Sequence, residues 1–345
     1  MDRREALRTL GRWGAGSLVM ANFAAAGSHR AVAAGAIPLT VGLGGFTFAY
    51  LPLLTAKAAG FLDAARLDVT FVNTGGGTNA MAATLGGSVD VCGLVMSDII
   101  LAAAKGQKIK AFAPLMAQYA SDAVIGVEAA RKAGLNAAMP LAERMARLKG
   151  LTLAISGRGS GTDKLWRYLV GLGGLDPDRD VTLTVVKLDQ MYAALKSGQI
   201  DGFNTTAPAN NRAVEDGLAV WVARPSRGEV PGLENFLYTV LGAKPDAIAS
   251  KSDAIDRLVA GLKKGGELVR ADPAGAGRLV QEHFFQQTDL ALVQKAVADQ
   301  AGTVSVPFGL TEKQFEQNRD FMQRFGEEVK QVAAADVMET RWSGR

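Results

Sequence analysis

Short apolar runs alternate with helix-like segments along most of this 345-residue chain, and glycine-containing turns separate them. The runs at 37–43, 67–72, 89–94 and 109–115 have the β-branched composition of strands, and segments with helical spacing lie between them. Alternation of this kind with short loops favours a largely parallel sheet, because parallel strands need a crossover connection. The chain is therefore expected to be an α/β protein.

The same pattern restarts near residue 151, with strands predicted at 151–155, 181–186, 200–204 and 219–222. A short motif links the two halves at a constant offset of 111 residues: Ala82-Ala83, Gly87 and Val89-Asp90 recur as Ala193-Ala194, Gly198 and Ile200-Asp201. Each copy is predicted to be a helix, a tight turn and the start of a strand, in which the Asp has a structural role. The repetition favours a pair of related lobes.

The predicted elements divide the chain into four segments: 1–34 as an export signal, 35–125 as the first part of lobe 1, 126–231 as lobe 2, and 232–345 as the remainder of lobe 1 with C-terminal helices. Beyond a strand at 236–240, helical patterns run over 252–268, 274–285, 289–301 and 311–332, with start signals at Asp272-Pro273 and Thr311-x-x-Gln314. These helices are expected to pack on lobe 1. A cleft between two lobes is a preferred site for a small molecule.

Residues 1–34 have the layout of a bacterial export signal, with a charged start, a modestly apolar middle and small residues at the end. The pair Arg3-Arg4 favours the Tat route over Sec, although Ala6 stands where Tat signals usually carry Phe. Cleavage near Ala33-Ala34 would place the mature protein in the periplasm, and an amphipathic N-terminal helix is the weaker alternative. This segment carries a net charge of +3 out of +4, so the remaining chain offers no basic surface for nucleic acid.

The scarcity of reactive side chains argues against an enzyme. The chain has one cysteine, Cys92, and two histidines, of which only His283 lies beyond the leader. No catalytic residue, metal site or cofactor is expected. Thr162 breaks the G-x-G-x-x-G pattern that begins at Gly157, and the mature chain contains no G-K-[ST] tripeptide of a P-loop.

The glycine-rich turn at 156–162 (SGRGSGT) is the most informative candidate for ligand binding. A turn of this type before a helix exposes N–H donors where the helix dipole favours negative charge, and Arg158 adds a fork suited to carboxylate, sulfonate or phosphate. A plain helix cap with Arg158 in solvent is the alternative. Further polar turns at 73–78, 96–98 and 204–208 could face the cleft, and the aromatics of 44–50 could line either the cleft or the core.

These features together resemble the substrate-binding proteins of nitrate/sulfonate/bicarbonate-type ABC transporters, a group that includes binders of taurine, alkanesulfonates and thiamine-pyrimidine precursors. The resemblance covers roughly residues 37–330 and is carried by Val41-Gly42-Leu43 to Tyr50, Ala56-Lys57-x-x-Gly60-Phe61, Leu85-x-x-x-Val89-Asp90 with Ser97, Leu148-Lys149-Gly150-Leu151 leading into 156–162, and Ala193-Ala194-Leu195-x-x-Gly198-x-Ile200-Asp201 with Pro208. It implies a type II periplasmic binding fold that closes on one ligand by hinge motion. The ligand contacts that it implies are Gly45, Phe46, Thr47, Thr78, Ser97, Arg158, Ser160 and Thr206.

The expected function is therefore that of a monomeric periplasmic solute-binding protein without enzymatic activity. It would bind a small organic ligand, sulfonate- or carboxylate-like, and deliver it to an ABC permease in the inner membrane. Two alternatives stay open: an enzyme on the same fold, such as a pyrimidine-synthase or lyase relative, and a ligand-sensing domain that docks a membrane receptor. The sequence does not name the ligand.

Overall fold

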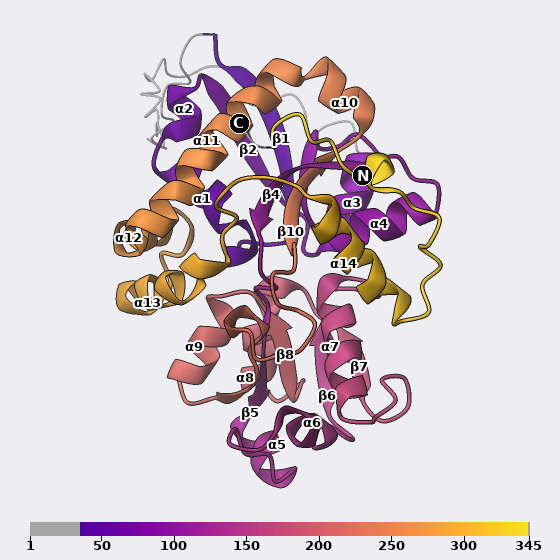
Figure 1. Ribbon diagram of the computed structural model, residues 1–345. Helices are drawn as coiled ribbons and strands as arrows, with labels where there is room; N and C mark the ends of the chain where they lie inside the picture. The colour runs from indigo at the N-terminus through magenta and orange to yellow at the C-terminus, as the bar shows by residue number, and fades with distance from the viewer. Residues whose placement is uncertain (1–34, 344–345) are drawn as a thin grey trace, which may run out of the picture. The chain divides into compact units, whose positions relative to one another are not determined.

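The computed structural model describes residues 35–343, which contain two five-stranded sheets (Figure 1). The first sheet has the order β2-β1-β3-β10-β4, in which β1 runs parallel to β2 and β3 and β10 runs antiparallel to its two neighbours. Its strands are β1 (Ile37–Leu43), β2 (Leu67–Asn73), β3 (Val91–Val95), β4 (Lys110–Met116) and β10 (Thr239–Ala243). Only β10 comes from late in the chain, since all five strands of the second sheet precede it in sequence.

The second sheet repeats this arrangement with the order β7-β6-β8-β5-β9. Strand β6 runs parallel to β7 and β8, and β5 runs antiparallel to β8 and β9. Its strands are β5 (Asp122–Gly126), β6 (Thr152–Ile155), β7 (Thr182–Val185), β8 (Gly202–Thr205) and β9 (Ala219–Ala223). In each sheet, one antiparallel strand thus takes the fourth place.

Helices pack around each sheet, and we call each sheet with its helices a lobe. The first lobe contains α1 (Leu51–Ala58), α2 (Phe61–Ala64), α3 (Gly77–Leu85), α4 (Met96–Ala104), α10 (Pro245–Ser250), α11 (Ser252–Ala271), α12 (Pro273–Phe284), α13 (Leu290–Gln300), α14 (Glu312–Gln323) and α15 (Ala334–Val337). The second contains α5 (Val127–Lys132), α6 (Leu141–Ala146), α7 (Gly161–Leu172), α8 (Met191–Lys196) and α9 (Ala209–Glu215). Single 3-10 turns are η1 (Phe48–Tyr50), η2 (Leu188–Gln190), η3 (Pro225–Arg227) and η4 (Ala301–Thr303). No helix within residues 35–343 combines the length and the apolar character needed to cross a membrane.

The C-terminal helices pack mainly on the first lobe, as predicted: α11 on α1, and α14 and α15 on α4. Both start signals are confirmed, since Asp272 accepts a hydrogen bond from the Gly275 amide and Thr311 forms a capping box with Gln314. The prediction for α14 was too long, because the helix ends at Gln323 and Gly326 then takes a left-handed conformation with φ of 72°. Helix α13 also reaches the second lobe, where Lys295 pairs with Glu215 at 3.5 Å.

The repeated motif has the same structural role in both lobes. The Oδ2 atom of Asp90 accepts hydrogen bonds from the backbone N–H of Thr40 at 2.9 Å and from its hydroxyl at 2.8 Å. The Oδ2 atom of Asp201 likewise accepts from the backbone N–H of Thr152 at 2.8 Å. Each carboxylate therefore ties the turn before a strand (β3 or β8) to the first parallel strand of its sheet, which confirms the structural role predicted for both residues.

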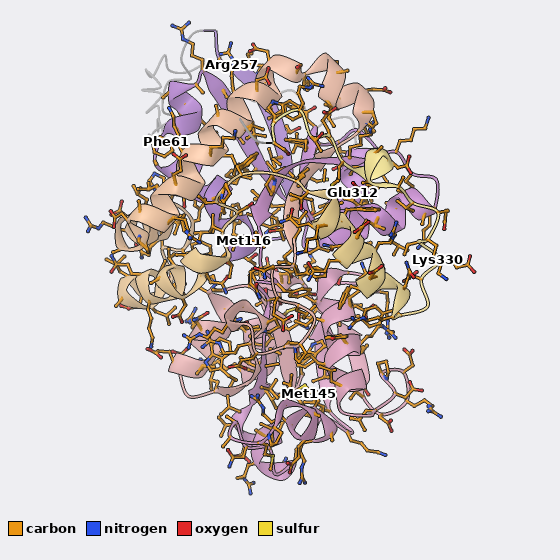
Figure 2. All side chains as sticks on the ribbon, in the orientation of Figure 1. Phe61, Met116, Met145, Arg257, Glu312 and Lys330 are labelled. Carbon is orange, nitrogen blue, oxygen red and sulfur yellow. The ribbon has the colours of Figure 1, made fainter. Side chains whose placement is uncertain are left out.

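Two segments cross between the lobes and are joined to one another. Residues 117–121 lead from β4 to β5, and residues 224–238 return from β9 to β10. The Tyr238 amide donates to the carbonyl of Met116 at 2.8 Å, at the end of β4, where Figure 2 labels Met116. Beyond the crossing, the carboxylate of Asp122 accepts from the amide of Ser226 at 3.1 Å and from its hydroxyl at 2.7 Å. The predicted segment boundaries at residues 125 and 231 stay predictions, and we note that β5 already begins at Asp122.

Candidate functional site

The turns that follow the parallel strands bring the two lobes into direct contact. The Phe48 amide of the first lobe donates to the carbonyl of Ala207 in the second at 2.7 Å. The next amide, that of Ala49, donates to the hydroxyl of Thr206 at 2.9 Å. Because each bond joins the first lobe to the second, the two bonds hold the lobes against one another, and we call this arrangement closed.

Glycine makes this close approach possible. At three positions, a Cβ atom would press against the opposite lobe, since distances of 3.0 to 3.1 Å are shorter than ordinary van der Waals contact. A Cβ at Gly76 would lie 3.0 Å from the carbonyl oxygen of Ser156. A Cβ at Gly157 would lie 3.1 Å from Oγ1 of Thr78, and one at Gly161 would lie 3.0 Å from Cγ1 of Val95. The glycine-rich turns at 74–77 and 156–161 therefore allow one lobe to touch the other. The sequence had suggested only their role in exposing donors.

A cavity of about 50 Å³ remains between the lobes, and we call it the interlobe cavity. Both lobes line it, mostly with hydroxyl-bearing and small side chains: Thr47, Ala49, Tyr50, Gly77, Leu94, Val95, Asp98, Tyr238 and Thr239 from the first lobe, and Ser156, Ser160, Gly161, Thr162, Leu188, Thr205 and Thr206 from the second. This volume holds one or two water molecules, whose share of liquid volume is about 30 Å³ each. An organic ligand can therefore enter only when the lobes separate, and its contacts then come from both.

Helix α7 delivers hydrogen-bond donors to this cavity. Ser160 caps the helix by accepting from the Asp163 amide, and Trp166 anchors it by donating from Nε1 to the carbonyl of Ala154 at 3.0 Å. Within residues 35–343, the N–H groups of Gly161 and Thr162 have no hydrogen-bond partner, and both residues line the cavity. The dipole of a 12-residue helix favours a negative or acceptor atom at this point.

Three hydroxyl groups surround the same helix start. The hydroxyls of Ser156, Ser160 and Thr162 lie 2.9 to 3.1 Å from one another, and Thr162 Oγ1 also accepts from the Ser156 amide at 2.8 Å. Hydroxyl groups rotate, so each can turn its proton toward a ligand oxygen or accept from a ligand N–H. The α7 start therefore offers two fixed donors and three adaptable groups.

One ion pair crosses between the lobes beside the cavity. Asp98, in the first turn of α4, binds the Nζ of Lys164, in the first turn of α7, through its Oδ1 atom. The Asp98 side chain is 13% exposed and that of Lys164 is 4% exposed. Burial raises the pKa of the Asp98 carboxyl, and the Lys164 ammonium offsets only part of this effect. A carboxylate at this position is therefore costly unless hydrogen-bond donors surround it.

The structure brings together some of the predicted contact residues. Thr47, Ser160 and Thr206 line the interlobe cavity. Ser97 is buried next to it, within 3.5 Å of the Lys164 Nζ. Gly45 approaches the second lobe, since a Cβ there would lie 3.4 Å from Cβ of Leu188.

Like Ser97 and Gly45, the other three predicted residues do not line the interlobe cavity. Phe46 stacks on Phe284 at a ring distance of 5.6 Å and also meets Phe71, so it packs in an aromatic cluster rather than on the cavity. Thr78 and Arg158 line a separate pocket of about 280 Å³ between α3, α4 and the α7 turn, which we call the α3–α4 pocket. Arg158 is exposed and donates to the carbonyl of Leu183 at 3.2 Å. Its role as a ligand contact stays a prediction.

The aromatics whose orientation the sequence left open belong largely to the core. Phe48 is fully buried and packs edge-on against Phe285 at 5.3 Å. Tyr50 is 5% exposed, donates its hydroxyl to the carbonyl of Gly93, and accepts from the Gly44 amide, both at 3.2 Å. Burial raises the pKa of Tyr50 to about 12, so the phenol stays neutral.

A further pocket lies beside α7, whereas the one cysteine and the one described histidine do not line the interlobe cavity. A pocket of about 690 Å³ lies between α7 and the end of α14, lined by cations including Lys164, Arg167 and Arg324. Cys92 is buried, which raises its pKa to about 12, and His283 is exposed on α12, where its ring contacts the carbonyl of Leu279. In the part of the chain that the structure describes, no group of three or more His, Cys, Asp or Glu side chains could hold a metal ion.

The sequence pattern predicted no role for Lys164 and placed Asp98 only within a polar turn. A weak signal existed for Lys164, because a cation in the first turn of a helix opposes the helix dipole and needs another reason to be there. Its partner lies 66 residues away on the other lobe, so only the folded structure joins the two.

Comparisons with known proteins agree with this architecture. Residues 34–281 match the model of the NMT1-like family. A solved protein of Bordetella bronchiseptica RB50 aligns with a TM-score of 0.77 and 22% identity, covering 88% of this chain and 95% of that one. The alkanesulfonate-binding protein SsuA of Xanthomonas axonopodis pv. citri, bound to MOPS, aligns with a TM-score of 0.70 and 19% identity over 89% of this chain and 99% of that one. These similarities confirm the predicted two-lobed α/β fold.

A curated relative matches more closely in sequence, but only over a short segment. The nitrate/nitrite binding protein NrtA of Nostoc sp. PCC 7120 is 42% identical over 67 residues, which are 19% of this chain and 15% of that protein. The matched segment is thus a small part of the relative.

Proposed function

Because the chain belongs to the NMT1-like family, we propose that it binds a small organic solute between its lobes and delivers it to the permease of an ABC importer. One observation carries the proposal: both lobes contribute hydrogen-bonding groups to a single cavity, and two hydrogen bonds close the lobes around it. A ligand that touches both lobes favours the closed state by its differential affinity, which is how such a protein signals that it is loaded.

The ligand is proposed to be small and organic, with a carboxylate or sulfonate end directed at the α7 start. The free N–H groups of Gly161 and Thr162 and the dipole of α7 support a negative group there. Thr47, Ser160 and Thr206 are the predicted contact residues best placed to meet such a ligand. Thr78 and Arg158 would meet only a ligand that extends into the α3–α4 pocket.

The proposal assigns the chain no chemistry of its own. Its one cysteine is buried in the first sheet with a raised pKa, and His283 lies on an exposed helix surface. We therefore expect a bound ligand to be recovered unchanged. Two of the similar proteins are named as binding proteins, for alkanesulfonates and for nitrate/nitrite, which supports binding rather than turnover.

We further propose that the protein is exported to the periplasm and acts there as a monomer. The layout of residues 1–34 in the sequence, which lie outside the described residues, supports the export. The permease partner is inferred from the family resemblance of the sequence.

Thermal unfolding of the purified protein against a panel of small organic acids, amino acids and heterocycles tests the proposal. A ligand at about 100 times its Kd should add about 2.7 kcal/mol of stability, which is a clear rise in Tm. Titration calorimetry should then show one site per chain. A panel in which no compound raises Tm, or a bound compound that is converted to product, would contradict the proposed function.

A further inference from the structure

Asp98 is the one charged side chain among the described residues that line the interlobe cavity. Every other lining side chain in this part of the molecule is neutral, and most carry a hydroxyl group or are apolar. Asp98 is therefore the ionic group that a ligand meets inside the cavity, and Lys164, behind the lining, offsets part of its charge.

The two oxygens of this carboxylate have different surroundings. Oδ1 binds the Lys164 ammonium, whereas Oδ2 has no hydrogen-bond partner within residues 35–343. Oδ2 lies next to Gly77, since a Cβ at that glycine would stand 3.5 Å away from it. Gly77 and Asp98 both line the interlobe cavity and the α3–α4 pocket, so Oδ2 is an unused acceptor at the point where the two spaces meet.

Cations near Asp98 are placed outside the cavity. The Lys164 Nζ is held by Asp98 and by the Ser97 hydroxyl, and Lys164 lines the pocket beside α14 rather than the cavity. Lys105 and Arg158 are exposed and line the α3–α4 pocket. The Lys164 ammonium therefore offsets the charge of the carboxylate from the Oδ1 side, and Oδ2 itself is left without a donor.

Building on the proposed function, we infer that Asp98 selects ligands that carry a protonated amine or an amidine-type N–H group, and that it disfavours simple anions. The donor would bind Oδ2, while the acceptor end of the same ligand meets the N–H groups of Gly161 and Thr162. A buried carboxylate with an unused acceptor gains from such a donor and repels a second anion placed beside it. The solute would then be a small amino carboxylate or amino sulfonate, rather than an inorganic anion or an unsubstituted alkanesulfonate.

Matched ligand pairs test the inference directly. Titration calorimetry would compare 3-aminopropane-1-sulfonate with propane-1-sulfonate, and β-alanine with propanoate, on the wild type and on Asp98→Asn. We expect the amino member of a pair to bind the wild type about 10- to 150-fold more tightly, the range for a charge-assisted hydrogen bond. In Asp98→Asn, this preference should fall to about threefold or less.

The preference within a pair is the readout because it cancels effects on closure that both ligands share. Lys164→Gln breaks the same interlobe ion pair but keeps Oδ2 of Asp98, so at a pH high enough to keep this carboxylate ionised without the ammonium it should keep the preference even if both affinities fall. Asp90→Asn is the matched control: it removes another Asp–Lys pair of the first lobe, with Lys251 at 2.8 Å, away from the cavity lining. It should leave the preference unchanged.

The outcomes distinguish a failure of the role of Asp98 from a failure of solute binding. Equal or tighter binding of the unaminated members, or a preference that survives in Asp98→Asn, would overturn the role of Asp98 while solute binding stands. A preference lost equally in Lys164→Gln would assign Asp98 a role in closure only, and would also overturn it. Wild-type protein that binds no member of either pair and no compound of the wider panel would refute the proposed function itself.

Discussion

Closure of the lobes should depend on the absence of a side chain at Gly161. A Cβ built at this position would lie 3.0 Å from Cγ1 and 3.3 Å from Cγ2 of Val95, which belongs to the opposite lobe. Gly161→Ala therefore overpacks the closed state, at a cost of about 1–3 kcal/mol, whereas the open state has room for the methyl group. A ligand that touches both lobes draws them together, so the same clash should raise its apparent Kd, by about 5- to 150-fold where the bound state brings Gly161 and Val95 as close as they are here.

The matched control lies in the same helix. At Gly171, no atom comes within 4 Å of an added Cβ, so Gly171→Ala should leave affinity unchanged and raise stability by about 0.5–1 kcal/mol. Calorimetry measures the affinities of both variants, with the tightest ligand from the panel. Hydrogen exchange reports closure without ligand, because the Phe48 and Ala49 amides donate across the gap and should exchange faster in Gly161→Ala. Wild-type affinity together with wild-type protection of these two amides would refute the reasoning.

Three further substitutions test the packing and the crossing segments. Gly93→Ala places a Cβ 2.3 Å from a ring carbon of Tyr50, which two hydrogen bonds hold in place. Urea unfolding should therefore show a loss of about 3 kcal/mol or more in the free energy of unfolding, and a loss below about 1 kcal/mol would contradict this. Burial raises the pKa of Asp122 to about 6, an effect that hydrogen bonds from Ser226 offset only in part, so the folded protein holds this proton more tightly than the unfolded chain does. The unfolding free energy of the wild type minus that of Asp122→Asn should therefore fall by about 2–3 kcal/mol as pH rises from about 4 to above 6, and a pH-independent difference would oppose the assignment. Thr311→Ala removes the cap of α14 and should cost about 1 kcal/mol by the same urea assay, whereas a neutral result would show that packing on α4 alone holds the helix.

Local signals explain what the sequence predicted correctly. Strand and helix order depends on apolar periodicity and on glycines at turns, both of which act over a few residues. The roles of Asp90 and Asp201 followed from their repeated position after a tight turn, and the caps at Asp272 and Thr311 followed from residue type and spacing. These interactions close short loops or recur in both halves, so the sequence contains their full pattern.

The site itself depended on contacts that no local pattern encodes. The direction of Arg158 was not predictable, because its partner is a carbonyl 25 residues away on β7. The family resemblance implied a ligand contact for Phe46, but its stacking partner, Phe284, lies on α12, more than 200 residues further along the chain. Asp98 and Lys164 meet only because α4 and α7 begin on facing lobes. The first two outcomes require long-range packing within one lobe, and the third requires the relative position of the two lobes.

The glycines between the lobes are explained by closure of the lobes and not by the hydrogen-bond donors that they offer. Every residue except proline carries a backbone N–H, so an alanine at position 161 would keep the donor that faces the cavity. The Cβ of an alanine would, however, clash with Val95 of the opposite lobe. Glycine at this turn is therefore explained by the approach of the lobes, and the choice of ligand is left to the few side chains that reach the cavity. On this division, substitutions at Gly161 should weaken all ligands by a similar factor, whereas substitutions at Asp98 should change their order.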